Sequence, residues 1–440
     1  MWQRSRCATR GCQAVRRAAI IFAVTNVVLA SLMVLWIGWR EIRNDSPALT
    51  TASIPLSLAD QQTRGGYLVR AGNCAGCHTS QGGQRFAGGR ELPTPFGTFV
   101  TPNITADRDT GIGAWSVEDF WRALHLGKSR DGKLLYPAFP YTEYTKVTRE
   151  DADAIFAYLQ TVAPVALVRV PDRLRFPYNV RALLYFWRAL YFKPGVHQPV
   201  ENQSAEWNRG AYLVQGLGHC NACHATRNAL GAAGGAALGG GQIAGRSWYA
   251  PSLTSSAEAG NGQLPIDEIA ELLSTGQSRK SSVAGPMAEV VAQSLQHLAD
   301  ADIRAMAIYL KSLPDSNTMP STRKELTANA TRRIANGGEI YKQHCKDCHG
   351  TEGEGAAGAY PPLAANRSVT LASPLNTIRS VLDGGYAPAT KVNSRPYGMP
   401  PFAHNLNSEE IAMVVSYVRN AWGNRASAVT ALEVDNSGSD

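Results

Sequence analysis

The chain has 440 residues, of which 44% are hydrophobic and 18% are charged, and its formal net charge is +8. This length fits two to four domains, and the composition excludes both a polytopic membrane protein and extended disorder over most of the chain. Five of the eight net charges lie in the first 17 residues, so the remainder is only slightly basic and no nucleic-acid partner is expected.

An uncharged apolar stretch follows these N-terminal arginines. Residues 18–39 contain no charged side chain, and as a helix they would extend about 33 Å, enough to cross a bilayer core. Trp36 and Trp39 lie where an aromatic belt is expected, and the arginines before the span predict a cytoplasmic N-terminus. A cleaved signal peptide is the alternative, but no small-residue cleavage site directly follows the long apolar run. We therefore expect residues 1–45 to form a cytoplasmic tail and an uncleaved anchor, with Cys7 and Cys12 as free cytoplasmic thiols.

Three copies of a Cys-x-x-Cys-His motif occur in the part of the chain that would be exported. Two cysteines on one helical turn can both form thioethers with one haem, and the next histidine can then ligate the iron. Zinc would require a second ligand pair near each motif, and a redox dithiol needs no following histidine. We expect three covalently attached haem c groups, held by Cys74 and Cys77, Cys220 and Cys223, and Cys345 and Cys348, with His78, His224 and His349 as iron ligands.

The surroundings of the three motifs also repeat, with a short predicted helix before each motif and a helix of apolar period at the end of each unit. This pattern resembles the small helical cytochrome c domain, which implies an all-α fold of three tandem domains at residues 55–165, 201–314 and 325–425. The resemblance implies that the first and last helices cross at Gly66, Gly210 and Gly337. It also implies that the carbonyl groups of Pro102, Pro251 and Pro361 accept hydrogen bonds from the haem histidines.

A haem with His/Met ligation takes its methionine from a segment before the last helix. Met287 and Met399 occupy such segments in the second and third units, and we expect both to ligate iron. The first unit has Phe139 at the corresponding place, and a phenyl ring cannot ligate iron. Loss of the thioether therefore predicts a lower reduction potential for the first haem.

Another residue of the first unit could replace the missing methionine. His125, on a predicted helix at residues 118–127, is one alternative, although a solvated histidine at a helix end is the simpler interpretation. Lys146 and Tyr141 are weaker candidates.

The segments between and after the units have distinct compositions. Within the inter-domain segment 166–200, residues 176–193 are rich in aromatic side chains and carry three basic ones, Arg181, Arg188 and Lys193. They predict a helix at a membrane surface or partner interface, with inter-domain packing as the alternative. Residues 314–330 are interpreted as a polar linker and residues 426–440 as a loose tail.

With the motifs placed, residues 55–425 resemble the triheme cytochrome c subunits of bacterial membrane-bound periplasmic dehydrogenases. The resemblance is carried by segments such as Thr101-Pro-Asn-Ile-Thr, Leu135-Tyr-Pro-Ala-Phe-Pro-Tyr, Gly218-His-Cys-Asn-Ala-Cys-His and Arg395-Pro-Tyr-Gly-Met-Pro. It implies a single-pass protein of the bacterial inner membrane, with periplasmic haem domains and no substrate-oxidising site of its own. Such a subunit passes electrons from a large catalytic subunit to ubiquinone.

The type of catalytic subunit is the most detailed prediction from the sequence. The alcohol dehydrogenase type usually has Pro-Ala-Met-Pro where this chain has Pro-Ala-Phe-Pro at Phe139. The difference favours a molybdenum-hydroxylase aldehyde dehydrogenase, with molybdopterin and a small iron–sulfur subunit. A PQQ alcohol dehydrogenase and a flavoprotein gluconate-type dehydrogenase are the alternatives. A haem enzyme that uses an open position on the first haem is a hypothesis of a different class.

Overall fold

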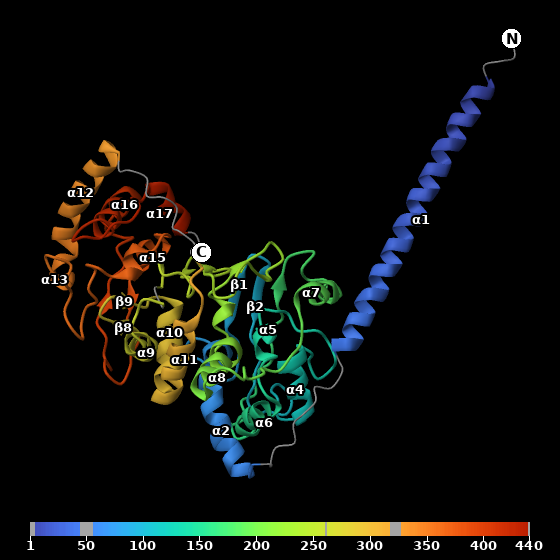
Figure 1. Ribbon diagram of the computed structural model, residues 1–440, viewed down its shortest axis with the longest axis horizontal. Helices are drawn as coiled ribbons and strands as arrows, with labels where there is room; N and C mark the ends of the chain where they lie inside the picture. The colour runs from blue at the N-terminus through green and yellow to red at the C-terminus, as the bar shows by residue number, and fades with distance from the viewer. Residues whose placement is uncertain (1–4, 45–55, 260–261, 317–326, 439–440) are drawn as a thin grey trace.

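The computed structural model describes residues 5–44, 56–259, 262–316 and 327–438. A long N-terminal helix, α1 (Ser5–Asn44), projects from a body of three helical domains, and domain 3 lies at the end of the body away from α1 (Figure 1). In each domain the first helix packs on the last. These pairs are α2 (Leu58–Ala71) with α6 (Arg149–Leu159), α8 (Ala205–Tyr212) with α11 (Asp300–Ser312), and α12 (Ala328–His344) with α16 (Ser408–Val418).

A glycine allows each pair of helices to approach closely. A Cβ atom on Gly65, Gly210 or Gly337 would lie 1.9, 1.9 or 2.1 Å from a backbone carbonyl oxygen of the opposite helix, a distance that no side chain tolerates. The prediction was therefore wrong for the first domain, where Gly65 rather than Gly66 lies at the crossing. Gly66 faces the ring of Tyr158, 3.0 Å from its ideal Cβ. Two consecutive glycines made the register ambiguous in the sequence.

The remaining helices are short. They are α3 (Cys74–His78), α4 (Val117–Leu126), α5 (Tyr141–Tyr144), α7 (Leu183–Tyr191), α9 (Ile266–Thr275), α10 (Pro286–Gln293), α13 (Lys346–His349), α14 (Arg367–Thr370), α15 (Leu375–Asp383) and α17 (Ala431–Ser437). The single turns η1 (Leu213–Leu217), η2 (Cys220–Ala222) and η3 (Leu295–His297) complete them.

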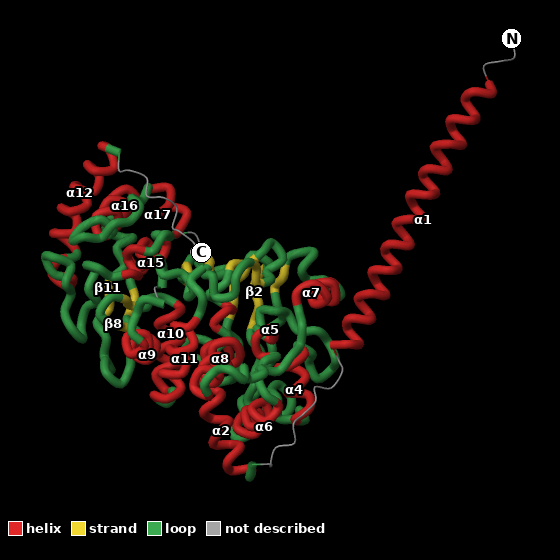
Figure 2. Tube along the Cα trace, in the orientation of Figure 1, coloured by secondary structure: helices red, strands yellow, loops and turns green. Residues whose placement is uncertain are grey.

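Short strands modify the all-α expectation (Figure 2). One sheet has the order β1 (Glu91–Thr94), β2 (Gly97–Val100), β3 (Arg173–Leu174). Four two-stranded ladders pair β4 (Thr226–Arg227) with β5 (Ala233–Gly234), β6 (Gly241–Gln242) with β7 (Tyr249–Ala250), β8 (Gln277–Ser278) with β9 (Ser281–Ser282), and β10 (Gly385–Tyr386) with β11 (Gly398–Met399). The long loops around the motifs satisfy part of their backbone hydrogen bonding through these ladders.

The hydrophobic cores do not follow the three-domain division. One continuous cluster of buried side chains runs from Leu68 in domain 1 to Leu310 in domain 2, whereas domain 3 has a separate cluster that includes Tyr341 and Val415. Domains 1 and 2 therefore share one core. Domain 3 meets domain 2 through polar contacts, such as the reciprocal hydrogen bonds between Asn376 and the backbone of Tyr249, 2.8 and 2.7 Å long.

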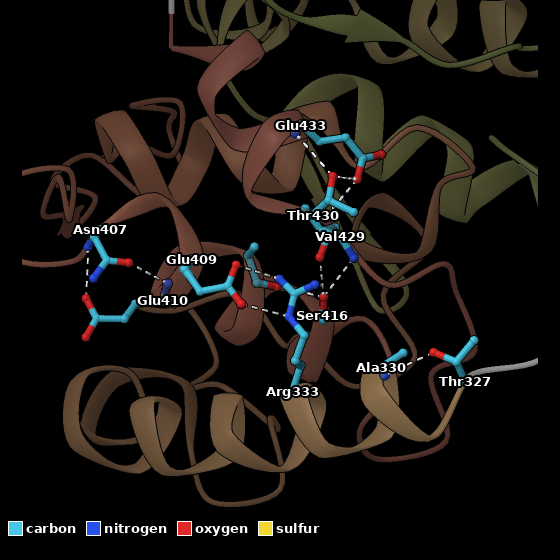
Figure 3. A network of polar contacts seen from close by, with 11 residues as sticks. Thr327, Ala330, Arg333, Asn407, Glu409, Glu410, Ser416, Val429, Thr430 and Glu433 are labelled. Atoms are coloured by element: carbon cyan, nitrogen blue, oxygen red, sulfur yellow. Dashed lines mark hydrogen bonds and ion pairs between the residues drawn. The ribbon is translucent and has the colours of Figure 1, made fainter.

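The C-terminal segment differs from the expected loose tail. Helix α17 begins with a capping box in which the Thr430 hydroxyl accepts from the Glu433 backbone and the Glu433 carboxylate accepts from the Thr430 backbone (Figure 3). The Ser416 hydroxyl on α16 accepts a 2.7 Å hydrogen bond from the Val429 backbone N–H. Because Val434 is buried against α15 and α16, this segment belongs to domain 3. Most of the predicted linker, residues 317–326, lies outside the described residues.

One helix among the described residues is long and apolar enough to cross a membrane, the part of α1 from Arg17 to Arg40, with a mean hydropathy of 2.5. The side chains of Cys7 and Cys12 lie outside the described part of α1.

Candidate functional site

Each Cys-x-x-Cys-His motif forms one helical turn. The backbone N–H groups of His224 and His349 donate to the carbonyl oxygens of Cys220 and Cys345 at 2.9 Å, and the first motif forms α3. Asn73 and His219, which precede the first two motifs, have φ angles of 47° and 37° and turn the chain sharply into the motif. The two cysteines and the histidine of each motif are therefore held on one turn, as thioether attachment of a haem requires.

A proline carbonyl orients each motif histidine, as the sequence predicted. Nδ1 of His78 lies 2.8 Å from the Pro102 oxygen, Nδ1 of His224 lies 2.7 Å from that of Pro251, and Nδ1 of His349 lies 3.2 Å from that of Pro361. A carbonyl oxygen only accepts, so Nδ1 must carry the proton and Nε2 keeps a free lone pair. Burial lowers the pKa of all three imidazoles and so favours this neutral form.

The surroundings of the thiols do not match a zinc site or a reactive dithiol. Burial raises the pKa of Cys74 and Cys220 to about 12 and that of Cys345 to about 11, so these groups are not activated thiolates. Within the part of the chain that the structure describes, no group of three His, Cys, Asp or Glu side chains could hold a metal ion. The raised pKa values thus do not fit a reactive dithiol.

Each candidate methionine packs against the same apolar cluster as the first cysteine of the motif in its own domain. Met287 occupies the first turn of α10 and packs against the same apolar cluster as Cys220. Met399 lies in strand β11 and packs against the same cluster as Cys345. A helix start and a two-residue strand therefore hold the two methionines. Phe139 packs against Tyr144, with ring centroids 5.3 Å apart, and beside the cluster that Cys74 contacts.

The structure gives the replacement candidates of domain 1 other contacts. His125 is 5% exposed rather than solvated; its Nδ1 lies 2.9 Å from the Thr145 carbonyl oxygen and its ring stacks on Trp121. Lys146 donates a 3.2 Å hydrogen bond to Gln215 of domain 2. Tyr141 is fully buried against Phe192. These contacts hold α4 and α5 to their neighbours.

The first two motifs face each other across the shared core. Tyr144 donates from its hydroxyl to the Gly72 carbonyl oxygen at 3.0 Å, two residues before Cys74, and its ring lies 5.3 Å from that of His219, next to Cys220. Burial raises the pKa of Cys223, and the nearby Cys77 thiol adds to this shift. Tyr144 therefore bridges the two motifs, a role that sequence reasoning did not identify.

A basic cavity of about 770 Å³ opens beside the first motif. Its lining includes three arginines, Arg85, Arg90 and Arg246, and two glutamates, Glu91 and Glu289. Because Arg90 pairs with Glu289, the guanidinium groups of Arg85 and Arg246 are the ones that suit the two carboxylates of a haem. Arg90 donates to the Gly76 carbonyl oxygen within the motif and forms a two-pronged ion pair with Glu289 of α10, two residues after Met287. The same arginine thus connects the first motif to the methionine helix of the second domain.

Two tyrosine–aspartate pairs, here called the exchanged pairs because each domain supplies one tyrosine and one aspartate, hold domains 1 and 2 together. Tyr67 of domain 1 donates to Asp302 of domain 2 at 2.6 Å, and Tyr212 of domain 2 donates to Asp151 of domain 1 at 2.5 Å. Each aspartate also pairs with an arginine of its own domain, Arg209 or Arg64. The arginines and tyrosines occupy equivalent places in the repeats Arg64-Gly-Gly-Tyr67 and Arg209-Gly-Ala-Tyr212.

The electrostatics of one pair favour this arrangement. Burial alone would oppose ionisation of Asp302, but the hydrogen bonds from Arg209 and Tyr67 outweigh it and lower the pKa of Asp302. Burial and the neighbouring carboxylate raise the pKa of Tyr67 to about 12, so its hydroxyl remains a donor. The pair therefore keeps a charged acceptor and a neutral donor at neutral pH.

The amino-acid sequence is similar to a known family profile and to several known proteins. The sequence profile of cytochrome c matches residues 62–163 and 334–422. The chain is 38% identical to the cytochrome c subunit of alcohol dehydrogenase (quinone) from Gluconobacter oxydans, over 82% of this chain and 79% of the relative. It is 38% identical to the gluconate 2-dehydrogenase cytochrome c subunit of Pantoea cypripedii, over 86% of this chain and 91% of the relative.

A further relative is a nicotinate dehydrogenase subunit of Pseudomonas putida, 42% identical over 81% of this chain, although the match spans only 30% of that longer protein. Members of the cytochrome c family bind haem c covalently, and the three Cys-x-x-Cys-His turns have the geometry for it. The chain belongs to the family of cytochrome c subunits of bacterial dehydrogenases.

Proposed function

We propose that this chain is a triheme electron-transfer subunit of a periplasmic dehydrogenase complex, anchored in the bacterial inner membrane by α1. The observation that carries the proposal is the threefold recurrence of one turn, in which a proline carbonyl fixes the histidine Nδ1 proton beside two cysteines. The haem irons would supply one-electron redox chemistry. The six motif cysteines would hold the haems through thioethers, and His78, His224 and His349 would ligate the irons. Met287 and Met399 would be further iron ligands at the second and third motifs.

The protein's part in electron transfer is to hold the three sites in a fixed order. The shared core and the exchanged pairs of Tyr67 and Tyr212 keep the first two motifs together, and Tyr144 fills the space between them. Domain 3 joins through polar contacts at the end away from α1 (Figure 1). We infer that electrons enter at the third motif and leave near the first, on the side where the anchor meets the body.

The donor and acceptor are assigned from the relatives. Alcohol dehydrogenase (quinone) is named for a quinone acceptor, which supports ubiquinone as the acceptor of this subunit. Nicotinate is an N-heterocycle, a substrate type of molybdenum hydroxylases, and the 42% identity to the nicotinate dehydrogenase subunit agrees with the substitution at Phe139. The proposed donor is therefore a molybdenum-hydroxylase catalytic subunit, oxidising an aldehyde or an N-heterocycle, with a small iron–sulfur subunit. The second candidate, a quinoprotein or flavoprotein dehydrogenase, is supported by the 38% identities to alcohol and gluconate dehydrogenase subunits.

Haem counting tests the cofactor assignment. The pyridine haemochrome spectrum and the intact mass of the full chain should both give three covalent haems, and the double substitution Cys345→Ala and Cys348→Ala should leave two. The control substitutions Cys7→Ser and Cys12→Ser should leave three. A wild-type chain with two haems would refute the triheme assignment. Purification of the complex from membranes, followed by analysis for molybdopterin, PQQ and flavin, decides among the partners.

A further inference from the structure

Helix α7 (Leu183–Tyr191) has its apolar face outward. Of its nine residues, Arg188 alone is charged, and this side chain is fully buried. Its guanidinium group donates to the Leu126 carbonyl oxygen and lies 4.7 Å from the ring centre of Phe192. A surface helix normally buries its apolar side and exposes its charges. Here the opposite arrangement leaves the outward face of α7 without any charge.

That outward face is apolar. Leu183 and Leu190 are 44% and 58% exposed and lie seven residues apart, so they share one side of the helix, opposite the side of Arg188. Tyr185 and Tyr191, 42% and 38% exposed, lie on other sides of the helix. Residues 176–193 contain no acidic side chain, and the basic residue Lys193 lies two residues after the end of the helix. We call Leu183 and Leu190 the outer face of α7.

The anchor helix meets the body at α7. Ile37 of α1 is 8% exposed, whereas apolar residues earlier in α1 such as Leu29 are more than half exposed. Three residues on, Arg40 donates a 3.1 Å hydrogen bond from Nη2 to the Ala189 carbonyl oxygen of α7. Helices α1 and α7 are therefore in contact where the apolar span from Arg17 to Arg40 ends (Figure 1).

This junction sets the height of α7 relative to the bilayer. Because α1 rises about 1.5 Å per residue, the contacts of Ile37 and Arg40 lie within one turn of the end of the span, beside Trp36 and Trp39. Aromatic side chains occupy this interfacial level in membrane proteins. An uncharged apolar face at the same level, continuous with the anchor, has lipid as its natural neighbour.

We propose that the outer face of α7 lies in the lipid interface and forms a second membrane contact beside the anchor. The proposal rests on the membrane anchoring proposed above. Its consequence is that domain 1 is held against the bilayer in one orientation instead of swinging on α1.

Photo-crosslinking of the full haem-loaded chain tests the proposal. The chain is reconstituted into vesicles of phosphatidylethanolamine and phosphatidylglycerol that carry a diazirine on the acyl chain, illuminated and digested with trypsin. Peptides 182–188 and 189–209 report α7, because trypsin does not cleave between Lys193 and Pro194. Peptide 18–40 reports the anchor, and peptide 305–311 is an apolar but buried control. We expect labelling of the α7 peptides to exceed that of the control by about tenfold.

The two proposals fail separately. Labelling of peptide 18–40 without α7 would overturn the second contact and leave the anchor standing. Labelling of α7 without peptide 18–40 would support the second contact and refute the uncleaved anchor. Labelling of neither would refute both. Hydroxyl-radical footprinting of the assembled complex separates lipid from a partner subunit. If the α7 peptides take no label from lipid but are protected from hydroxyl radicals in the complex, a partner subunit covers α7 and the proposal is overturned.

A variant pair adds specificity. Leu183→Glu together with Leu190→Glu should remove α7 labelling and keep both the labelling of peptide 18–40 and the haem content, because neither side chain is buried. Leu58→Glu, on an equally exposed leucine of α2, is the matched control and should leave α7 labelling unchanged. Unchanged α7 labelling in the double variant would contradict the proposal.

Discussion

The exchanged tyrosine–aspartate pairs predict a specific loss of stability. Tyr212→Phe removes the hydroxyl that donates to Asp151 at 2.5 Å while the ring remains. Tyr212 is 6% exposed and the Asp151 side chain 2% exposed, so water cannot replace the lost donor without repacking. A hydrogen bond to a charged group contributes about 1.5–3 kcal/mol. Because Arg64 still pairs with Asp151 at 2.6 Å, we expect a loss of about 2 kcal/mol.

Urea unfolding of the holoprotein measures this loss. Domains 1 and 2 and the segment between them contain Trp115, Trp121, Trp187, Trp207 and Trp248, whereas domain 3 contains Trp422 alone, so the large fluorescence change reports the shared core. With an m-value of roughly 3 kcal/mol per molar urea for a unit of this size, the midpoint should fall by about 0.7 M. The transition of domain 3 should not move, because it has a separate core.

Tyr158→Phe is the matched control. The Tyr158 ring packs on Gly66 of α2, and its hydroxyl has no hydrogen bond among the described residues, so its substitution should shift the midpoint by less than about 0.2 M. Equal shifts in the two variants would refute the claim that the Tyr212–Asp151 bond stabilises the interface. Separate unfolding transitions for domains 1 and 2 in the wild type would refute the shared core itself.

Three further predictions concern the pairs, the helix crossings and the iron ligands. The stabilisation from the Tyr67–Asp302 pair should be constant between about pH 4 and pH 10. It should be lost in acid as pH falls through the pKa of Asp302, which is lowered from its normal 3.8, and in alkali as pH rises from 10 towards the Tyr67 pKa of about 12. Unfolding of the wild type and of Tyr67→Phe at a series of pH values checks this prediction. Gly65→Ala should destabilise the chain by about 3 kcal/mol or more, because the new Cβ would lie 1.9 Å from a backbone oxygen. Gly195→Ala is the control and should change the unfolding midpoint little, because no atom lies within 4 Å of its ideal Cβ. Similar midpoints for the two variants would contradict the crossing at Gly65. Met399→Leu should lower one reduction potential towards that of the first site and leave three covalent haems, as redox titration and haem counting can show; an unchanged titration would exclude Met399 as a ligand.

Local chemistry explains which site features could be predicted. The Cys-x-x-Cys-His spacing defines one helical turn, and the acceptors Pro102, Pro251 and Pro361 follow at places that the cytochrome c pattern implies, so the hydrogen bonds to His78, His224 and His349 were predicted and are confirmed. The crossing in domain 1 was misplaced by one residue because Gly65 and Gly66 satisfy the same pattern, and the carbonyl of Ala154 decides between them.

Other features depend on burial that a local pattern does not contain. His125 at the end of α4 looked solvated, but Trp121 and Thr145 enclose it. The C-terminal segment looked loose because it is short and polar, yet the side chain of Val434 and a capping box at Thr430 are enough to fold α17 onto α16 (Figure 3). Propensity alone is weak for such short helices, and tertiary packing provides their stability.

By itself the sequence determined the local features of this protein: the Cys-x-x-Cys-His turns, their orienting prolines, the absence of a methionine in the first unit, and an apolar N-terminal helix. Only the tertiary structure decided how the units combine. Tyr67 meets Asp302 across 235 residues, Tyr144 bridges two motifs, and Arg188 turns inward so that α7 presents an apolar face beside the anchor. The physical reason is that haem attachment depends on residues within one helical turn, whereas a shared core depends on side chains that only the folded chain brings together.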